Sequence, residues 1–248
     1  MNQREAMPFS GSTLKWMAII IMLIDHIGAS LLEVFVLDYY GASPLTGYPA
    51  GNGYFWYEVD TVLRYIGRSA FPIFCFLLVE GAVHTRSPKK YLMRLAAFAA
   101  VSEIPFDLAL RGSFFYWGAQ NVFFTLLLGL LVIQVFQNYP VESWKGVLAL
   151  GVLGAAAEFC GTDYGAAGVA VIAVMYLLRD RPLASSSASL VILVLMSPVE
   201  IFSIPAFLAI SLYNGKRGRQ PKYFFYVFYP LHLLILWAVG NFVLPAAV

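Results

Sequence analysis

The stretch "MAIIIMLIDHIGASLLEVFVL", Met17–Leu37, decides the fold class, because it is long and apolar enough to cross a lipid bilayer as a helix. Asp25 and His26 lie at its middle. On insertion scales an Asp at the bilayer centre costs about 2.5–3.5 kcal/mol, while each Leu or Ile contributes only about 0.3–0.6 kcal/mol. A polar pair at this depth therefore requires partners on other helices or a function.

The whole chain has the composition of a membrane protein. Of its 248 residues, 60% are hydrophobic and 12% are charged, against about 45–50% and about 25% in soluble domains. We predict an all-α polytopic membrane bundle that forms a single domain over residues 1–248, with a polar N-terminal extension at 1–13. Neither a phosphate-binding glycine loop nor a Rossmann fingerprint occurs. We expect no metal and no nucleic-acid partner.

Hydropathy predicts about nine membrane-spanning helices, given about 20 residues for a full span. They cover residues 14–36, 61–83, 91–110, 120–138, 144–159, 164–179, 186–199, 201–214 and 223–244. An N-terminus in the cytoplasm places thirteen of the 16 Lys and Arg residues in or beside cytoplasmic loops. Because positive charge marks the cytoplasmic side, we predict this orientation.

Two pairs of charged residues lie inside the second and third predicted spans. Arg64 and Arg68 are four residues apart, as are Glu103 and Asp107, so each pair occupies one helix face. Isolated charges in lipid would be costly, which predicts mutual pairing within the bundle. The four residues form either a purely structural clasp between the two helices or the support of a functional site.

Asp25 and His26 are expected to serve different partners. Adjacent residues of a helix point about 100° apart, so Asp25 should reach another helix, with Arg68 a candidate partner, rather than orient His26. A histidine in the membrane can be a packing residue, but the charged surroundings of His26 favour a function. His232, in the middle of the last span, stays open between packing and function.

Basic residues of the predicted cytoplasmic loops form a second group. They either determine topology or bind a cytosolic ligand that carries phosphate. The candidates are Arg86, Lys89, Lys90, Arg94, Lys216, Arg217 and Arg219.

Several blocks of the sequence resemble the TraX family of bacterial membrane acetyltransferases, which is named for the protein that acetylates conjugative pilin. The blocks are "LKWMAIIIMLIDHIGA" (14–29), "IGRSAFPIFCFLLVEG" (66–81), "YLMRLAAFAAVSEIPFDL" (91–108), "NVFFTLLLGLL" (121–131) and "YFFYVFYPLHLLIL" (223–236). The family also looks distantly similar to transmembrane acyltransferases such as heparan-α-glucosaminide N-acetyltransferase.

The resemblance implies a multi-pass protein of the bacterial plasma membrane that uses cytosolic acetyl-CoA as donor. His26 would be the catalytic base, with Asp25 beside it, and Arg68 or Asn121 would steady the oxyanion. Arg64, Glu103, Asp107 and His232 would support the polar core, and the basic loop residues would hold the donor. The acceptor would be an amine or hydroxyl, such as a peptide N-terminus or a glycan, presented from the membrane or its outer side.

Transfer could be direct or could pass through an acetyl group on His26. Two other classes of protein remain open from the residues. Intramembrane Asp, Glu, Arg and His also build the proton relays of proton-coupled transporters, although no repeated halves are visible here. A non-catalytic scaffold would explain the basic loops but not the polar interior.

Overall fold

The computed structural model describes residues 7–41, 48–49, 51–219 and 224–244. The regular structure of these residues is helical, apart from two isolated β-bridges. The elements are α1 (Gly11–His26), the π-helix η2 (Ile27–Leu37), α2 (Asp38–Tyr40), α3 (Gly53–Gly67), α4 (Ala70–His84), α5 (Pro88–Arg111), α6 (Val122–Asn138), α7 (Trp144–Phe159), α8 (Gly165–Leu177), α9 (Pro182–Met196), the 3₁₀-helix η3 (Pro198–Ser203), α10 (Ile204–Ser211) and α11 (Phe224–Phe242).

The predicted all-α membrane bundle is confirmed, because these elements make nine helical passes in the described part of the chain. α1, η2 and α2 form one pass, α3 and α4 another, and η3 and α10 a third. The passes Gly11–Tyr40, Gly53–His84 and Phe224–Phe242 are each long and apolar enough to cross a membrane. Four shorter apolar helices are Val122–Asn138, Gly165–Leu177, Pro182–Met196 and Pro198–Ser211.

The second pass begins at Gly53, earlier than the predicted residue 61. Residues 53–60 contain Glu58 and Asp60, which lower the hydropathy of this stretch. In the structure the stretch is nevertheless helical, and Asp60 is buried against η2, where a side chain on Gly28 would meet its carboxylate. Tertiary packing therefore extends the helix beyond what hydropathy predicts.

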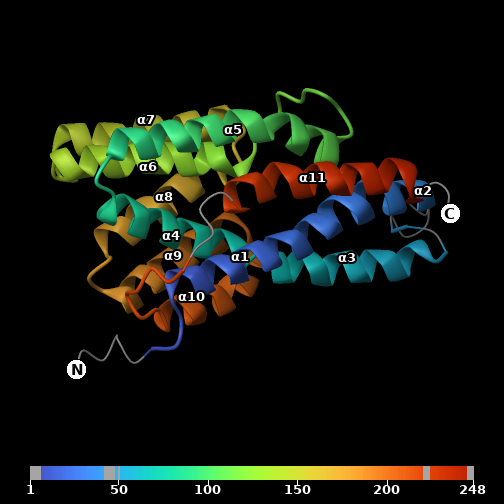
Figure 1. Cartoon of the computed structure of the whole chain (residues 1–248), viewed down its shortest axis with the longest axis horizontal. Helices are drawn as coiled ribbons and strands as arrows, with labels where there is room; N and C mark the ends of the chain where they lie inside the picture. The colour runs from blue at the N-terminus through green and yellow to red at the C-terminus, as the bar shows by residue number, and fades with distance from the viewer. Residues whose placement is uncertain (1–6, 42–47, 50, 220–223, 245–248) are drawn as a thin grey trace.

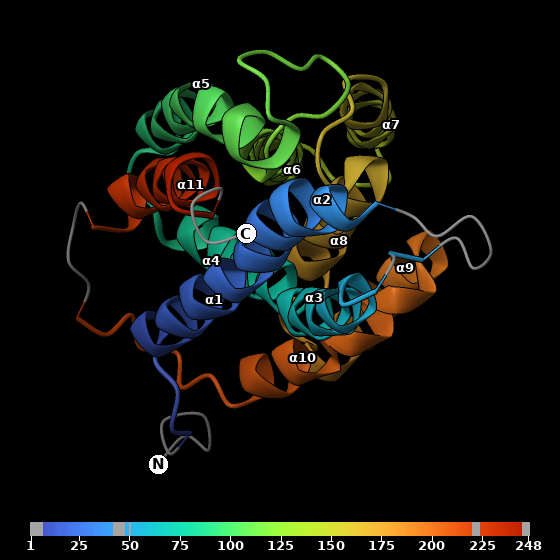
Figure 2. The same cartoon turned by 90° about the vertical axis from the view of Figure 1, so that its right-hand side faces the viewer.

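The core lies around α4 and α8. Seen along the long axis, these two helices are surrounded by the others (Figure 2), and Ile73 of α4 and Val169 and Ile172 of α8 are fully buried. η2, α3 and α11 run together to one end of the molecule, whereas α6, α7 and α8 end near mid-length (Figure 1).

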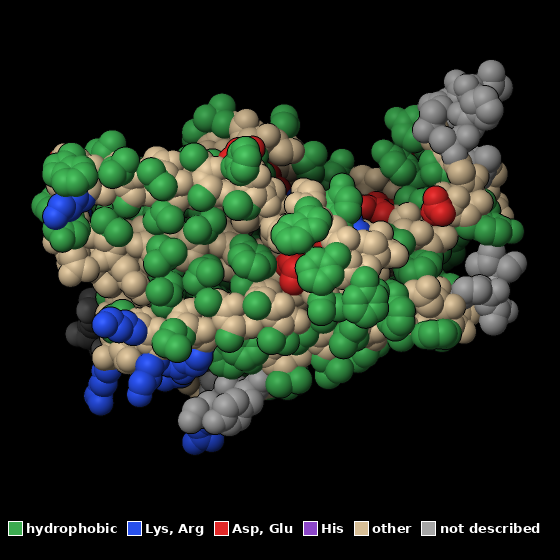
Figure 3. Space-filling model, turned by 90° about the horizontal axis from the view of Figure 1, so that it is seen from above, with side chains coloured by type: hydrophobic (Ala, Val, Ile, Leu, Met, Phe, Trp, Pro, Cys, Tyr) green, Lys and Arg blue, Asp and Glu red, His purple; other side chains and the backbone are tan. Residues whose placement is uncertain are grey.

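The other end of the molecule is basic. Most of the Lys and Arg side chains visible in Figure 3 gather there, while the acidic side chains on that face lie from mid-length onward. The predicted N-terminal extension is partly folded at this end, although residues 1–6 lie outside the described residues. Phe9 pairs through its backbone with Leu212 and Asn214, and the side chain of Ser10 caps α1 by accepting a hydrogen bond from Thr13 N.

The connection between α5 and α6 meets the connection between α7 and α8. Gln120 N donates to Gly161 O at 2.9 Å, and Asp163 N donates to Gln120 O at 3.0 Å. The hydroxyl of Thr125 donates to Thr162 Oγ1 at 3.0 Å. These bonds tie the start of α6 to the α7–α8 connection and so fix Asp163 and Tyr164 beside the polar interior.

Candidate functional site

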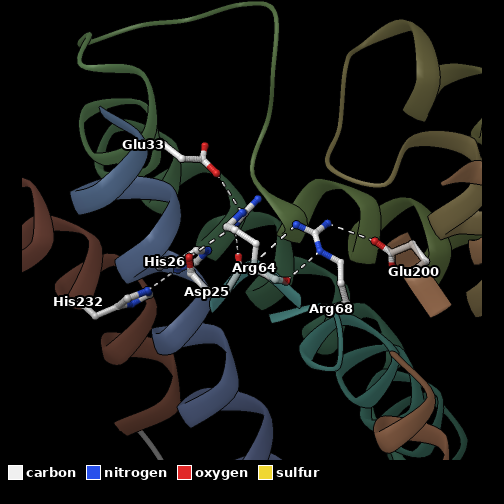
Figure 4. Close-up of polar contacts among 7 residues, drawn as sticks. All are labelled: Asp25, His26, Glu33, Arg64, Arg68, Glu200 and His232. Atoms are coloured by element: carbon white, nitrogen blue, oxygen red, sulfur yellow. Dashed lines mark hydrogen bonds and ion pairs between the residues drawn. The ribbon is translucent and has the colours of Figure 1, made fainter. Parts of the chain in front are cut away.

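The site is built at the end of α1, where the α-helix gives way to the π-helix η2. As predicted, the neighbours Asp25 and His26 point to different helices (Figure 4). The carboxylate of Asp25 faces Arg64 of α3, and the ring of His26 faces His232 of α11. The two halves of the site therefore use separate partners.

The first half is an alternating array of five charged side chains. Arg64 binds Asp25 (Nη1–Oδ2, 2.6 Å) and Glu33 (Nε–Oε1, 3.1 Å). Arg68 lies 3.9 Å from Asp25 (Nη2–Oδ1) and binds Glu200 (Nη1–Oε1, 3.2 Å). The prediction that Asp25 meets Arg68 is confirmed, although Arg64 is the closer partner. The array contains three carboxylates and two guanidinium groups, so its formal charge is negative when all are ionised.

Local features of the backbone bring these charges together. The second pass breaks between Gly67 and Ala70, and the hydroxyl of Ser69 in this break donates to Phe202 O at 3.2 Å. That bond docks η3 against the break, which brings Glu200 to Arg68. Tyr65 stacks on Phe202 with ring centroids 4.0 Å apart, and this contact holds η3 in place.

The second half is a pair of histidines. Nδ1 of His26 lies 2.6 Å from Nε2 of His232, and the ring planes differ by 7°. Nδ1 of His232 lies 2.8 Å from the backbone oxygen of Phe228. Nε2 of His26 has no hydrogen-bond partner among the residues that the structure describes.

A small cavity of about 80 Å³ joins the two halves. Its lining includes Asp25, His26, Arg64 and Arg68, together with Asp163. Val122, the first residue of α6, and Tyr164, which precedes α8, also line it, so it lies where these helices begin. The cavity thus combines an imidazole, guanidinium groups and carboxylates in a space that fits a small reacting group.

Comparison with known proteins identifies the family of the chain. The family described as "TraX protein" matches residues 10–240 of the chain. The chain belongs to the TraX family. A relative that is 30% identical over 94% of this chain and 97% of its own length is the "Probable fimbrial assembly protein FimC, serogroup H1" of Dichelobacter nodosus. No solved structure matches the chain.

In this TraX family member, the predicted contact between the arginine pair and the acidic pair does not form. The hypothesis that Arg64 and Arg68 form a clasp with Glu103 and Asp107 is wrong, because both arginines bind the carboxylates of the array. Asp107 instead accepts a hydrogen bond from Tyr116 N at 2.8 Å. The i,i+4 spacing correctly placed each pair on one helix face, but it did not determine which helix that face meets.

Asn121 has a structural place outside the cavity. Its Oδ1 accepts from Phe123 N at 3.0 Å and caps α6, and its Nδ2 donates to Ala99 O at 2.9 Å and to Glu103 Oε2. Each polar atom of the amide is thus used between α5 and α6. The role of Asn121 in steadying an oxyanion therefore stays a prediction, which these structural hydrogen bonds do not support.

The predicted donor-binding residues lie at the basic end, apart from the histidines. Arg86, Lys89, Lys90, Arg94, Lys216, Arg217 and Arg219 are all exposed. A second cavity of about 250 Å³ lies beside them, with Arg179, His84 and three serines among its lining residues and an apolar wall that includes Phe76 and Met175. The two cavities share no lining residue.

Sequence reasoning missed four residues of the site: Glu33, Asp163, Tyr164 and Glu200. A signal for Glu200 existed, since it is the one charged residue between Arg181 and Lys216. Tyr164 carried no such signal. It is the one non-glycine residue in the described ranges with positive φ, 63°, and its ring stacks on Phe71 at 3.7 Å. Strained backbone of this kind costs about 1–3 kcal/mol and tends to occur at functional sites.

Proposed function

We propose that this protein is a membrane acetyltransferase that moves an acetyl group from acetyl-CoA to an amine, with a hydroxyl as the other possible acceptor. The observation that carries the proposal is His26, whose Nε2 is unpartnered among the described residues while its ring lines a cavity shared with Arg64 and Arg68. Membership of the TraX family supports acetyl transfer through the resemblance of that family to pilin acetyltransferases.

The reaction needs a base and a group that stabilises negative charge. The amine nitrogen attacks the thioester carbon, its proton passes to Nε2 of His26, and the N–C bond forms. The C–S bond then breaks, and the CoA thiolate takes the proton from His26 to leave as the thiol. Arg68 lines the same cavity, and its guanidinium would stabilise the oxyanion that develops on the thioester carbonyl.

Charge favours an amine as acceptor. The array carries one more carboxylate than guanidinium groups, and Asp163 adds another carboxylate to the cavity. Oδ1 of Asp25 is buried without a hydrogen-bond partner in the described residues, so no hydrogen bond from these residues offsets its negative charge. An excess of negative charge attracts a cationic ammonium group, which must release one proton to water before its nitrogen attacks the thioester as a neutral amine. The name of the fimbrial relative suggests a fimbrial or pilin N-terminus as one such amine.

The donor would bind at the basic end, which we propose faces the cytosol of a bacterial plasma membrane. The phosphates of acetyl-CoA would meet the exposed Lys and Arg side chains and Arg179 of the larger cavity. A row of rings leads from this end to the histidines: Trp16–Phe224 at 5.0 Å, Phe224–Phe228 at 5.7 Å and Phe228–His232 at 4.9 Å between centroids. The pantetheine arm would lie along this row.

The test is CoA release by the purified full-length protein from acetyl-CoA, with and without a short peptide that has a free N-terminus. His26→Asn is the informative variant, because an amide near the place of Nδ1 keeps a donor for His232 but supplies no base. We expect it to lower turnover at least about 100-fold. Ser189→Ala, which removes a buried hydroxyl outside both cavities, should turn over normally. Unchanged turnover in His26→Asn would remove His26 from the mechanism.

The same preparation separates the remaining mechanisms. If labelled acetyl-CoA incubated without acceptor leaves no label on the protein, this result counts against an acetyl group carried on His26. Proteoliposomes with a proton gradient test the transporter alternative. Proton-linked uptake without any CoA release would contradict acetyl transfer.

A further inference from the structure

When both rings are neutral, the hydrogen bonds of His232 fix the position of every proton on the two histidines. A carbonyl oxygen has no proton to give, so Nδ1 of His232 donates to Phe228 O. A neutral imidazole carries one N–H, and Nε2 of His232 must therefore accept a proton from Nδ1 of His26. The same count leaves Nε2 of His26 without a proton.

We propose that His232 is a positioning residue that holds His26 in its Nδ1–H tautomer and so presents the bare Nε2 to the cavity. The inference rests on the proposed function for its chemical purpose, because Nε2 is the atom that would take the proton of the acceptor. It assigns His232 a role other than packing. The tautomer of a histidine is set by the partner of its other nitrogen, and here that partner comes from the last helix of the chain.

The surroundings of His232 prevent its ring from turning. Phe228, one turn earlier on α11, stacks on His232 with centroids 4.9 Å apart and planes 12° apart. Tyr229 presents its edge to His232 at 5.5 Å and to His26 at 5.9 Å. Since His232 is only 4% exposed, water does not compete for its two nitrogens. The direction of the hydrogen-bond chain is thus fixed by packing within α11.

The arrangement replaces the carboxylate of an ordinary catalytic triad by a neutral imidazole. The carboxylate of Asp25 is held by Arg64 and Arg68 and does not reach the His26 ring. Besides His232, the charged or titratable groups around His26 at the cavity are Asp25, Arg64, Arg68, Asp163, Tyr164 and Tyr229. When Nε2 of His26 takes a proton, the Nδ1–H bond to His232 becomes charge-assisted and stronger. His232 then stabilises the imidazolium of His26. Because His232 is itself neutral, it does not favour protonation of His26 before the reaction.

Two substitutions of His232 separate this role from simple packing. In His232→Gln the amide oxygen lies near the place of Nε2 and can still accept from His26. In His232→Asn the amide lies near the place of Nδ1, so the bond to Phe228 O is kept but the acceptor for His26 is lost. We expect His232→Gln to retain kcat within about tenfold and His232→Asn to lose about 100-fold or more in kcat with little change in KM. Wild-type kcat in His232→Asn would overturn the proposal.

The tautomer itself can be read without any turnover. The chain has 3 histidines, so ¹⁵N-histidine labelling combined with His84→Gln leaves only the His26 and His232 rings in the spectrum. Two-bond N–H correlations should show Nδ1–H and bare Nε2 on both rings, and His232→Asn should release His26 to the Nε2–H form. An Nε2–H form of His26 in the otherwise unchanged protein would overturn the proposal. A correct tautomer without CoA release would instead overturn the proposed function alone.

Discussion

Gly67 of α3 lies against Asp25 of α1 so closely that a Cβ atom on Gly67 would be 2.5 Å from both Cβ and Cγ of Asp25. No side chain fits into that space. This contact lets the two helices approach until Arg64 reaches the carboxylate at 2.6 Å. A glycine, and not a charged residue, therefore sets the geometry of the ion-pair array.

The first prediction concerns this approach. Gly67→Ala should push α1 and α3 apart, lower the thermal unfolding temperature and reduce the proposed acetyl transfer, because Asp25 and Arg64 lose their contact. The control is Gly151→Ala in α7, where a Cβ would meet nothing within 4 Å. That change should be neutral or stabilise by up to about 1 kcal/mol, as expected for Ala in a helix interior. Equal unfolding temperatures for the two variants would contradict the prediction.

The second prediction concerns Arg68 and Glu200. The side chain of Glu200 is 1% exposed, and Arg68 is its ion-pair partner among the described residues, whereas Arg68 also lies near Asp25. Arg68→Gln leaves a buried carboxylate unpaired and should destabilise by about 3–5 kcal/mol. Glu200→Gln should cost less. The double variant should be more stable than Arg68→Gln alone, as measured by thermal unfolding in detergent. Strictly additive effects would show that the two residues are not coupled.

The third prediction concerns Asn121, which the structure places in a helix cap. Asn121→Ala removes the cap of α6 and the donor to Ala99 O, so it should destabilise by about 0.5–2 kcal/mol for the cap alone. Turnover per folded molecule should stay near that of the unchanged protein. Asn121→Asp keeps the cap but faces the carboxylate of Glu103 and should be the less stable of the two. A loss of kcat in a well-folded Asn121→Ala protein would restore a catalytic role.

The fourth prediction concerns Asp163, an exposed residue at the edge of the small cavity. Asp163→Asn should raise KM for a cationic peptide amine several-fold and weaken the salt dependence of KM, since one attracting charge is lost. KM for acetyl-CoA should not change. The matched control is Glu142→Gln, which removes an exposed carboxylate from the α6–α7 connection. The same KM shift in both variants would mean that only the net charge of the protein matters.

Hydropathy predicted the number of passes well, and the reason is physical. In lipid every backbone N–H and C=O must form its hydrogen bond within the segment. A long apolar stretch therefore forms a helix. The prediction for residues 144–159 coincides with α7, and the last span differs from α11 by one or two residues at each end. The hydropathy prediction failed at residues 53–60, where burial of Asp60 against η2 stabilises a helix in a polar local sequence.

Spacing within one helix gave part of the site. It placed Arg64 and Arg68 on one face and turned Asp25 and His26 to different helices, and both features are present. Spacing could not predict which residues of other helices contact that face. Glu200 is 132 residues from Arg68 and His232 is 206 residues from His26, and no local pattern encodes which distant helix packs beside α1 or α3.

The sequence by itself determined that this chain is a helical membrane bundle with a polar centre, because the cost of exposing charge or open backbone to lipid acts on each segment separately. Only the tertiary structure decided how that centre is assembled. Which carboxylate binds which arginine, and which nitrogen of His26 faces His232, depend on contacts between helices that are remote in sequence. Those contacts follow from how all the passes fill space together.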